Sequence, residues 1–337
     1  MKILRIASLV LALLVGAALA YMLANAMVTE RPVGLQLVQA PDAGGAPLTV
    51  AVWYPTDAQP LPSTWLGLNL LSVAKDAPVL GKALPLVIVS HGNGGGPGSH
   101  ADLAMALAQR GFVVAAPMHT GDNYADQSAA GSARWLVDRT RHVHATLDHL
   151  LGAWPGRASV DPKRIGIFGF SAGGFTGLTI VGGQPDLKRV AAQCRTAPEF
   201  VCTLLAEARS PLLDAAQAPP AGAFKRDARV KAAVLAAPGL GFTFVPDGLA
   251  TVEVPVQLWS GGADQNVPTA TNAGPVGQAL GARAQMHEIA GAGHFAFLAP
   301  CRLFGPPLLC RDAPGVDRER EHTQMNEAVA AFFLKVL

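Results

Sequence analysis

The segment GFSAG at residues 169–173 contains the residue types of a serine nucleophile. It follows an apolar, strand-like run and precedes a helix-like run, so Ser171 would lie at a sharp turn between a strand and a helix. Such an elbow strains the backbone and brings neighbouring chain close, which suits Gly169 and Gly173 because they carry no Cβ. A structural turn filled by a small serine explains the same residues, so the motif alone leaves both interpretations open.

A serine hydroxyl is a poor nucleophile until a base removes its proton, and an acid must hold that base in the right tautomer. Two later strand-like segments end in such residues, VQLWSGGAD in Asp264 and MHEIAGAGH in His294. The order Ser171, Asp264, His294 is one in which catalytic triads occur. Asp264 could instead cap a turn, and His294 could be an ordinary loop histidine. Their joint placement at strand ends favours the catalytic interpretation of the serine.

An oxyanion hole needs two backbone N–H groups aimed at the charge that develops during acyl transfer. Ala172, directly after the serine, would supply one of them. Asn93 would supply the other, because it lies in the glycine-rich segment HGNGGG that follows the apolar run LPLVIVS. We expect His91 to shape this loop rather than to transfer protons. A phosphate-cradling loop is the rival interpretation, but no G-K-[ST] or G-x-G-x-x-G context supports it.

Three histidines, His142, His144 and His149, share a predicted helix with Asp138 and Asp148. Aspartate and histidine four residues apart could indicate a metal site. No H-E-x-x-H is present, however, and His144 faces away from His142, so the sequence favours a solvated helix face. We therefore expect neither a metal ion nor a cofactor.

The elements that must position these residues alternate between strands and helices. Because ligands bind at the carboxyl ends of the strands in an open parallel sheet, the residues at those ends should converge. The alternation predicts an α/β fold with a mostly parallel twisted sheet, right-handed crossovers and helices on both faces. Residues 56–83 are interpreted as a loop. The predicted strands are 33–39 and 47–55, as an antiparallel pair, then 84–92, 112–117, 164–170, 230–239, 254–264 and 284–294, and the predicted helices are 99–111, 133–151, one starting at 172, and 316–337.

Composition is that of a globular chain with a sizeable core. Of its 337 residues 50% are hydrophobic and 15% are charged, which suits one large α/β domain or two small ones. We predict a single domain over residues 31–337, with a cap or lid inserted at 183–228, where an alanine- and proline-rich stretch interrupts the alternation. A net charge of +2 without a long basic run gives no reason to expect a nucleic-acid partner.

The N-terminus has the pattern of an export signal. Lys2 and Arg5 precede an uninterrupted apolar run, and two small-x-small sites end at Ala20 and Ala26. Residues 1–26 are therefore expected to be a signal peptide or an N-terminal anchor. The protein would be periplasmic or secreted, and an uncleaved signal would tether it to a membrane.

Export changes the interpretation of the four cysteines, because an oxidising compartment favours disulfides. No C-x-x-C is present, which argues against a redox or zinc site. Four cysteines allow three connectivities, but proximity in sequence favours Cys194 with Cys202 and Cys301 with Cys310. Free buried thiols in a cytosolic protein are the alternative.

A family resemblance is carried by VAVWYP, LVIVSHGNGG, GFVVAAPMHTGDN, DPKRIGIFGFSAGG, VKAAVLAAPGLG, VPVQLWSGGADQNVP, GAGHFAFL and CRLFGPPLLC. From about residue 33 to the C-terminus, the chain resembles the α/β-hydrolase superfamily, and within it the exported serine hydrolases grouped with dienelactone hydrolase and platelet-activating-factor acetylhydrolase. Dienelactone hydrolases have cysteine as the nucleophile, whereas this chain has Ser171, so their substrate does not carry over.

The resemblance implies the same roles as the residues themselves: Ser171 as nucleophile, His294 as base, Asp264 as acid, and Asn93 with Ala172 as oxyanion donors. The expected function is hydrolysis of small-molecule carboxylic esters through an acyl-enzyme. The apolar segment FAFLAPCRLFGPPLL, which begins after the histidine, suggests with the predicted lid a pocket for an apolar acyl group. A peptidase or acyltransferase with the same triad and an inactive hydrolase fold used for binding are the alternatives.

Overall fold

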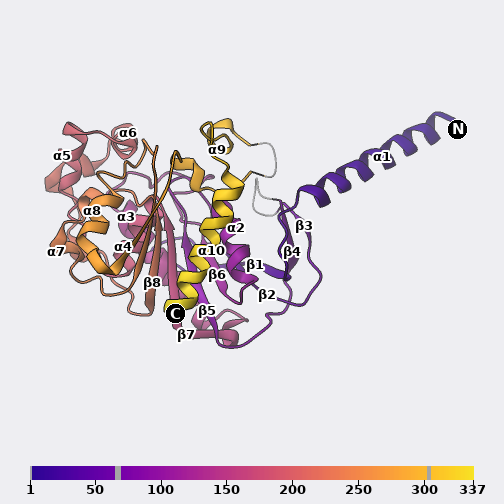
Figure 1. The fold of residues 1–337 in the computed structure, drawn as a ribbon, viewed down its shortest axis with the longest axis horizontal. Helices are drawn as coiled ribbons and strands as arrows, with labels where there is room; N and C mark the ends of the chain where they lie inside the picture. Colours follow the sequence, from indigo (N-terminus) through magenta and orange to yellow (C-terminus); the bar gives the residue numbers. More distant parts are fainter. Residues whose placement is uncertain (1, 65–69, 302–304) are drawn as a thin grey trace.

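The computed structural model describes residues 2–64, 70–301 and 305–337. Its central feature is a ten-stranded mixed sheet with the strand order β10-β9-β8-β7-β5-β6-β2-β1-β4-β3 (Figure 1). Strands β5 to β10 run parallel, whereas β2 pairs antiparallel with both β6 and β1. The strands are Val33–Ala40 (β1), Leu48–Pro55 (β2), Leu61–Ser63 (β3), Leu71–Lys75 (β4), Leu84–Ser90 (β5), Val113–Pro117 (β6), Val160–Phe170 (β7), Val230–Ala236 (β8), Val256–Gly261 (β9) and Ala284–Ile289 (β10).

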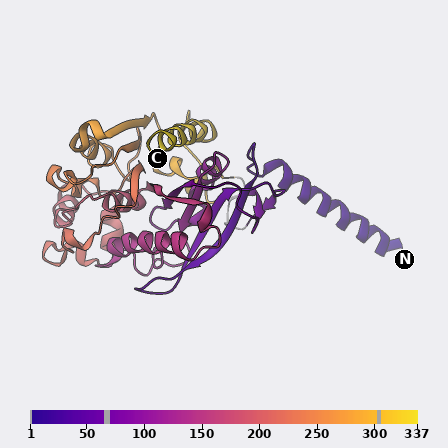
Figure 2. The same cartoon turned by 90° about the horizontal axis from the view of Figure 1, so that it is seen from below.

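Two layers of helices cover the sheet. Buried residues of α3 (Trp135–Gly152), α4 (Ala172–Ile180) and α8 (Ala273–Leu280) form one apolar core with one face of the sheet. Those of α2 (Ala101–Ala108) and α10 (Arg318–Val336) form a second core with the opposite face. Figure 2 shows α10, in yellow, and α3, in pink, on opposite sides of the strands. The predicted mostly parallel sheet with helices on both faces is confirmed.

Parallel pairing brings the ends of the central strands together. Each residue of β6 and of β9 is buried, as expected for strands with both faces covered. Ser90 at the end of β5 pairs with Gly169 of β7, and Phe170 of β7 pairs with Ala236 of β8. The loops that follow these strands therefore open at the same edge of the sheet, where the candidate site residues lie.

The interpretation of residues 56–83 as one loop was wrong, because the segment contains β3 and β4. β4 pairs parallel with β1 and antiparallel with β3, and Leu71 and Val73 of β4 are buried in the same core as α2. A short strand of this kind has little periodicity of its own and is held by its partner strand. Residues 65–69 of the predicted loop lie outside the described residues.

The stretch 183–228, predicted to be a cap, contains α5 (Arg189–Thr196) and α6 (Phe200–Glu207), followed by three short 3₁₀ turns. A disulfide between Cys194 and Cys202 joins the two helices, and a second links Cys301 to Cys310. Both bonds follow the pairing favoured from the sequence. The division into one domain with a cap insertion stays a prediction.

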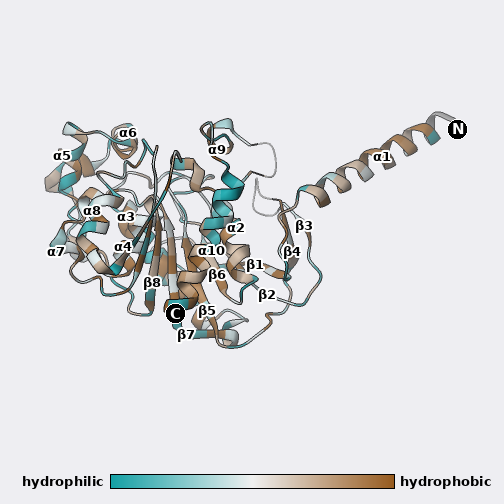
Figure 3. Ribbon diagram, in the orientation of Figure 1, coloured by the Kyte–Doolittle hydropathy of each residue, from teal (hydrophilic) through white to brown (hydrophobic). Residues whose placement is uncertain are grey.

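The N-terminal helix α1 (Lys2–Asn25) extends away from the rest of the chain, as Figure 1 shows. It is coloured largely hydrophobic in Figure 3, and its stretch Arg5–Asn25 has a mean hydropathy of 2.5 and is not buried. At about 1.5 Å per residue this stretch is long enough to cross the roughly 30 Å core of a bilayer. The apolar helix and the two disulfides fit an exported protein.

Candidate active site

Ser171 lies between the last residue of β7 and the first of α4, at the strand-to-helix turn expected from the sequence. Its φ of 55° is in the left-handed region, which is strained for a residue with a side chain. A Cβ on Gly169 would overlap the Gly173 carbonyl oxygen, and a Cβ on Gly173 would overlap that of Ser90. The two glycines therefore permit the close backbone approach that holds the serine at this turn.

His294 lies between Ser171 and Asp264. Its Nε2 is 3.0 Å from Ser171 Oγ, and its Nδ1 is 2.7 Å from an Asp264 carboxylate oxygen. The other carboxylate oxygen accepts backbone hydrogen bonds from Asn266 and Val267, at 2.9 and 2.8 Å. Because a carboxylate only accepts, the Nδ1–H donates to Asp264 and Nε2 is left to accept the serine proton. The structure thus brings the three predicted residues into one hydrogen-bonded chain.

The Phe170 ring packs against His294, with a distance of 4.8 Å between the ring centroids. Both His294 and Asp264 are buried. Burial and an aromatic neighbour limit the orientations open to the imidazole. The ring is therefore kept in the one orientation that makes both hydrogen bonds, to Ser171 and to Asp264.

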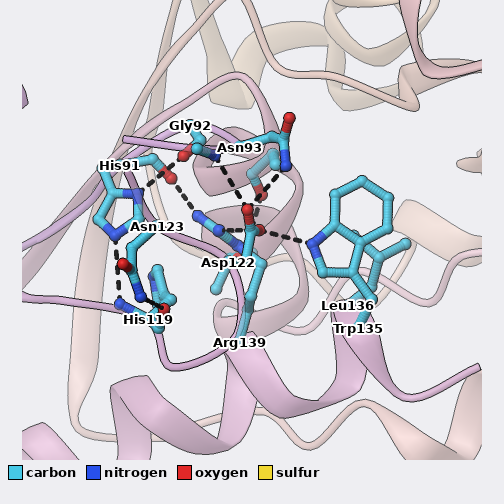
Figure 4. A network of polar contacts seen from close by, with 12 residues as sticks. His91, Gly92, Asn93, His119, Asp122, Asn123, Trp135, Leu136 and Arg139 are labelled. Carbon is cyan, nitrogen blue, oxygen red and sulfur yellow. Dashed lines mark hydrogen bonds and ion pairs between the residues drawn. The ribbon is translucent and has the colours of Figure 1, made fainter. Parts of the chain in front are cut away.

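The two predicted oxyanion donors lie in the same pocket as Ser171. Ala172 is the first residue of α4, where a backbone N–H has no partner within the helix. Asn93 lies in the loop after β5 (Figure 4). His91 is buried in this loop, where its Nδ1–H donates to the Gly92 carbonyl oxygen at 2.7 Å. Burial, together with the nearby Arg139 charge, lowers the pKa of His91 to about 3, so His91 is neutral.

Sequence reasoning missed a polar network beneath this loop, which Figure 4 shows. Asp122, in the loop after β6, and Arg139, on α3, form a buried ion pair. The Asp122 carboxylate also accepts from the Asn93 side chain at 2.7 Å and from the Trp135 indole at 2.5 Å. The segment HTGDN, which contains Asp122, was notable only as part of the family resemblance. Nothing in the local spacing links it to an arginine 17 residues later in the chain.

The expectation of a solvated face for the α3 histidines was wrong for His142. Its ring is buried and stacks on His119, with ring centroids 5.4 Å apart. Burial first, and then the charge of Arg141, lowers the pKa of His142 to about 3. The cause is the crossing of α3 over the loop after β6, which a helical pattern alone does not reveal. Within residues 2–64, 70–301 and 305–337, no cluster of three or more His, Cys, Asp or Glu could hold a metal ion.

The pocket beside Ser171 is small, with a cavity of about 20 Å³. Six of its lining residues are large and apolar, and they come mainly from α6, α3 and the loops after β8 and β9. No described residue of the apolar segment 295–309 lines it, and residues 302–304 of that segment lie outside the described residues. The large apolar lining residues are Trp135, Phe200, Val201, Leu204, Leu240 and Val267.

Hydrogen bonds hold the start of α6 next to this pocket. Glu199, just before α6, accepts from the side chains of Thr271 at 2.5 Å and Asn272 at 2.9 Å. Gln193 of α5 donates to the same carboxylate at 3.1 Å. A larger open groove of about 660 Å³ lies between α2 and α10, but it contains none of the site residues. We therefore place the candidate active site in the smaller pocket, next to the serine.

Comparisons with known proteins bear on the family and the fold. Residues 73–213 match the model of the dienelactone hydrolase family. This stretch includes the loop of Asn93 and the elbow of Ser171. It ends before Asp264 and His294, so the roles proposed for these two residues rest on the geometry of this chain. A comparison with curated protein sequences finds no significant match.

The fold is also similar to that of a solved ferulic acid esterase from Streptomyces cinnamoneus. The TM-score is 0.63 with 20% sequence identity, over 93% of this chain and 92% of that chain. At this identity the likeness concerns the fold. The match of residues 73–213 to the family model supports an ester hydrolase. The chain has the α/β-hydrolase fold, and its residues 73–213 are similar to the dienelactone hydrolase family.

Proposed function

We propose that this protein is a serine hydrolase of carboxylic esters, with Ser171 as nucleophile, His294 as general base and Asp264 as the orienting acid. The observation that carries the proposal is the position of His294, with Nε2 3.0 Å from Ser171 Oγ and Nδ1 2.7 Å from Asp264. Both distances are within the range for proton transfer and for tautomer control.

In the first step, Ser171 Oγ attacks the ester carbonyl carbon while its proton moves to His294 Nε2. The carbonyl oxygen becomes negative, and the N–H groups of Ala172 and Asn93 stabilise it. The C–O bond to the alcohol then breaks, and His294 returns the proton to the leaving oxygen. Asp264 remains ionised and stabilises the imidazolium that forms in between.

In the second step, water attacks the acyl-enzyme. His294 removes a proton from the water, the tetrahedral intermediate forms again, and its collapse releases the acid and restores the Ser171 hydroxyl. His294 must be neutral at the start of each step, because only an unprotonated Nε2 can accept a proton.

The lining of the pocket supports an apolar group on the substrate. Burial of apolar surface contributes about 25 cal/mol per Å² removed from water, so the side chains around Ser171 favour an acyl or aryl group over a charged one. A cavity of about 20 Å³ has room for about one water, which needs roughly 10–15 Å³ by this measure. An ester with a larger acyl or aryl group therefore needs the predicted cap to move.

Turnover of p-nitrophenyl esters of increasing acyl length by the wild type and by Ser171→Ala tests the function. We expect turnover by the wild type and a loss of at least about 10⁴-fold in the variant, because the nucleophile is removed. Parallel assays of an amide and of an alcohol acceptor distinguish a peptidase or an acyltransferase. Turnover in pure Ser171→Ala protein close to that of the wild type would contradict the proposed nucleophile.

The N-terminal helix is proposed to be a membrane anchor of an exported enzyme. Residues just after it belong to the fold, because Met27 is buried and exchanges backbone hydrogen bonds with Leu70 at 2.8 Å and Ser72 at 2.9 Å. An anchored catalytic domain would thus begin directly at the membrane surface. Retention in the membrane fraction after an alkaline wash is expected, and a soluble mature form lacking α1 would contradict the anchor.

A further inference from the structure

A buried ion pair lies directly beneath the loop that carries Asn93. The side chains of Asp122 and Arg139 are 2% and 1% exposed. Removing two charges from water costs several kcal/mol per ion, so a buried pair is tolerated only where further hydrogen bonds satisfy both partners. Arg139 Nη1 donates to one carboxylate oxygen, which also accepts from the Trp135 indole. Arg139 Nε donates to Thr176 Oγ1 of α4 at 3.4 Å, and the other hydrogen bonds of the pair go to the oxyanion loop.

The pair holds this loop at three points, as Figure 4 shows. The other oxygen of Asp122 accepts from the Asn93 side chain at 2.7 Å and from the Gly94 backbone N–H at 3.0 Å. Arg139 Nη2 donates to the His91 carbonyl oxygen. The backbone on each side of Asn93 is therefore bound to one buried pair.

The chemical consequence concerns the direction of the Asn93 N–H. Gly94 has a φ of +65°, a conformation that glycine adopts readily, so the loop turns sharply just after Asn93. The Asn93 side-chain amide and the Gly94 backbone N–H are both bound to Asp122. The neighbouring peptide group, which carries the Asn93 backbone N–H, therefore has little freedom to rotate. An oxyanion hole acts through donors fixed before the reaction, because reorganising them during the reaction costs energy.

The carboxylate is suited to this task because it stays ionised. Burial alone would raise the pKa of Asp122, but the Arg139 charge and the hydrogen bonds from Trp135 and Gly94 lower it. An ionised carboxylate accepts from all its donors at once, whereas an asparagine oxygen replaces only part of this capacity. Charge-assisted hydrogen bonds are also roughly twice as strong as neutral ones.

We propose that Asp122 and Arg139 are positioning residues that hold the Asn93 N–H in the oxyanion hole. The inference rests on the proposed ester hydrolysis. Neither residue touches the reacting atoms. They act through the loop between His91 and Gly94, and through Trp135 the same carboxylate also fixes one wall of the substrate pocket.

Asp122→Asn tests the proposal with two kinetic measurements. We expect kcat to fall about 10²- to 10³-fold, the range for loss of an oxyanion donor, with KM within about threefold of the wild type. The second measurement is the inhibition constant of a trifluoromethyl ketone. Ser171 Oγ adds to the ketone carbon and its proton moves to His294, so the resulting oxyanion occupies the hole. This constant should rise by about the factor by which kcat/KM falls.

Asp227→Asn is the matched control. Asp227 is buried and forms an ion pair of 2.6 Å with Arg229. It lies just before β8, at the amino ends of the parallel strands, whereas Ser171 lies at their carboxyl ends. Its replacement should lower the melting temperature while leaving kcat and the ketone inhibition constant within about twofold of the wild type. General destabilisation by a broken ion pair is thereby separated from loss of the oxyanion hole.

Folded Asp122→Asn with wild-type kcat and ketone affinity would overturn the proposal. If that variant does not fold, Asn93→Ala removes the hydrogen bond to Asp122 but keeps the backbone N–H. It should lower kcat and ketone affinity together by about tenfold, and no change in either would equally overturn the proposal. Failure of the wild type to hydrolyse esters or to bind the ketone would instead contradict the proposed function.

Discussion

The buried pairs Asp264–His294 and Asp102–His322 both place the carboxylate on Nδ1, and they differ in what the second imidazole nitrogen faces. His294 bonds Asp264 at 2.7 Å through Nδ1, and its Nε2 faces the Ser171 hydroxyl. His322 bonds Asp102 at 2.6 Å through Nδ1, but its Nε2 faces the Ala296 carbonyl oxygen at 2.7 Å. A hydroxyl can give up a proton, whereas a carbonyl oxygen only accepts one.

The difference separates a base from a structural cation. Because both partners of His322 are acceptors, both of its nitrogens must donate, and the ring is held protonated. Burial alone would lower the pKa of His322, but the Asp102 carboxylate and these hydrogen bonds raise it. An aspartate–histidine pair is thus no indication of catalysis by itself. The group beyond the second nitrogen decides its role.

The largest expected effect comes from breaking the first pair at its histidine. His294→Gln should lower kcat/KM by about 10⁴-fold or more, because no other group lies in place to accept the serine proton. Its melting temperature should change little compared with that of His322→Gln. Steady-state kinetics with a p-nitrophenyl ester measures the loss, and a loss of less than tenfold would show that His294 is not the base.

Asp264→Asn should lower kcat by about 10³- to 10⁴-fold, slightly less than the loss of the base. Asparagine keeps the shape of the side chain but can donate to Nδ1, which places the imidazole proton on the wrong nitrogen. KM should remain close to that of the wild type. An equal loss from Asp102→Asn would remove the distinction between the two pairs.

His322→Gln should mainly affect stability. Removing one member of a buried charged pair costs about 3 kcal/mol, since Asp102 is left without its partner. His322 bonds the short turn that also carries His294, so kcat/KM should fall, but by less than about tenfold. Urea unfolding monitored by fluorescence measures the free energy of unfolding. A stability equal to that of the wild type would contradict the structural role.

The pH dependence of stability should report the second pair. The raised pKa of His322 gives stabilisation that is fully present below its ordinary pKa of about 6.5 and lost as pH rises through the raised value. Burial would raise the pKa of Asp102, but His322 lowers it to about 2, so this contribution is lost as pH falls through that value. The stability difference between wild type and His322→Gln should therefore be largest between about pH 4 and 6.5, and a difference independent of pH would contradict it.

The smallest effect concerns access to the first pair. Glu199→Gln weakens the hydrogen bonds that hold the cap over Ser171, so kcat/KM should rise about two- to fivefold for esters of long acids, which need the cap to open. The acetate ester is the control, because it needs less room and should change by less than twofold. A decrease for long acids would indicate that Glu199 helps to form the open pocket.

Local patterns predicted the parts of the fold and site that depend on neighbouring residues. The buried central strands and the elbow at Ser171 are encoded by continuous apolar runs and by glycines at a turn. The order of strands then implied that Asp264 and His294 would lie at the same edge of the sheet as the serine. Those positions agree with the structure, and the catalytic roles stay proposals.

Features that depend on packing of distant segments could not be predicted. Asp122 and Arg139 form a pair only because α3 packs against the loop after β6. The pocket lining comes largely from α6, in the alanine- and proline-rich stretch that interrupts the alternation, and not from the apolar segment after His294. β3 and β4 are short and depend on pairing at the sheet edge.

The rate at which a fluorophosphonate labels Ser171 compares the two pairs most directly, because the reagent needs an activated serine but no particular substrate. Ser171 Oγ attacks phosphorus, fluoride leaves, and the serine proton moves to the base. His322→Gln should label within about tenfold of the wild-type rate, and His294→Gln at least about 10³-fold more slowly. Labelling of His294→Gln at the wild-type rate, or an equal loss in both variants, would contradict the assignment of His294 as the base that activates Ser171.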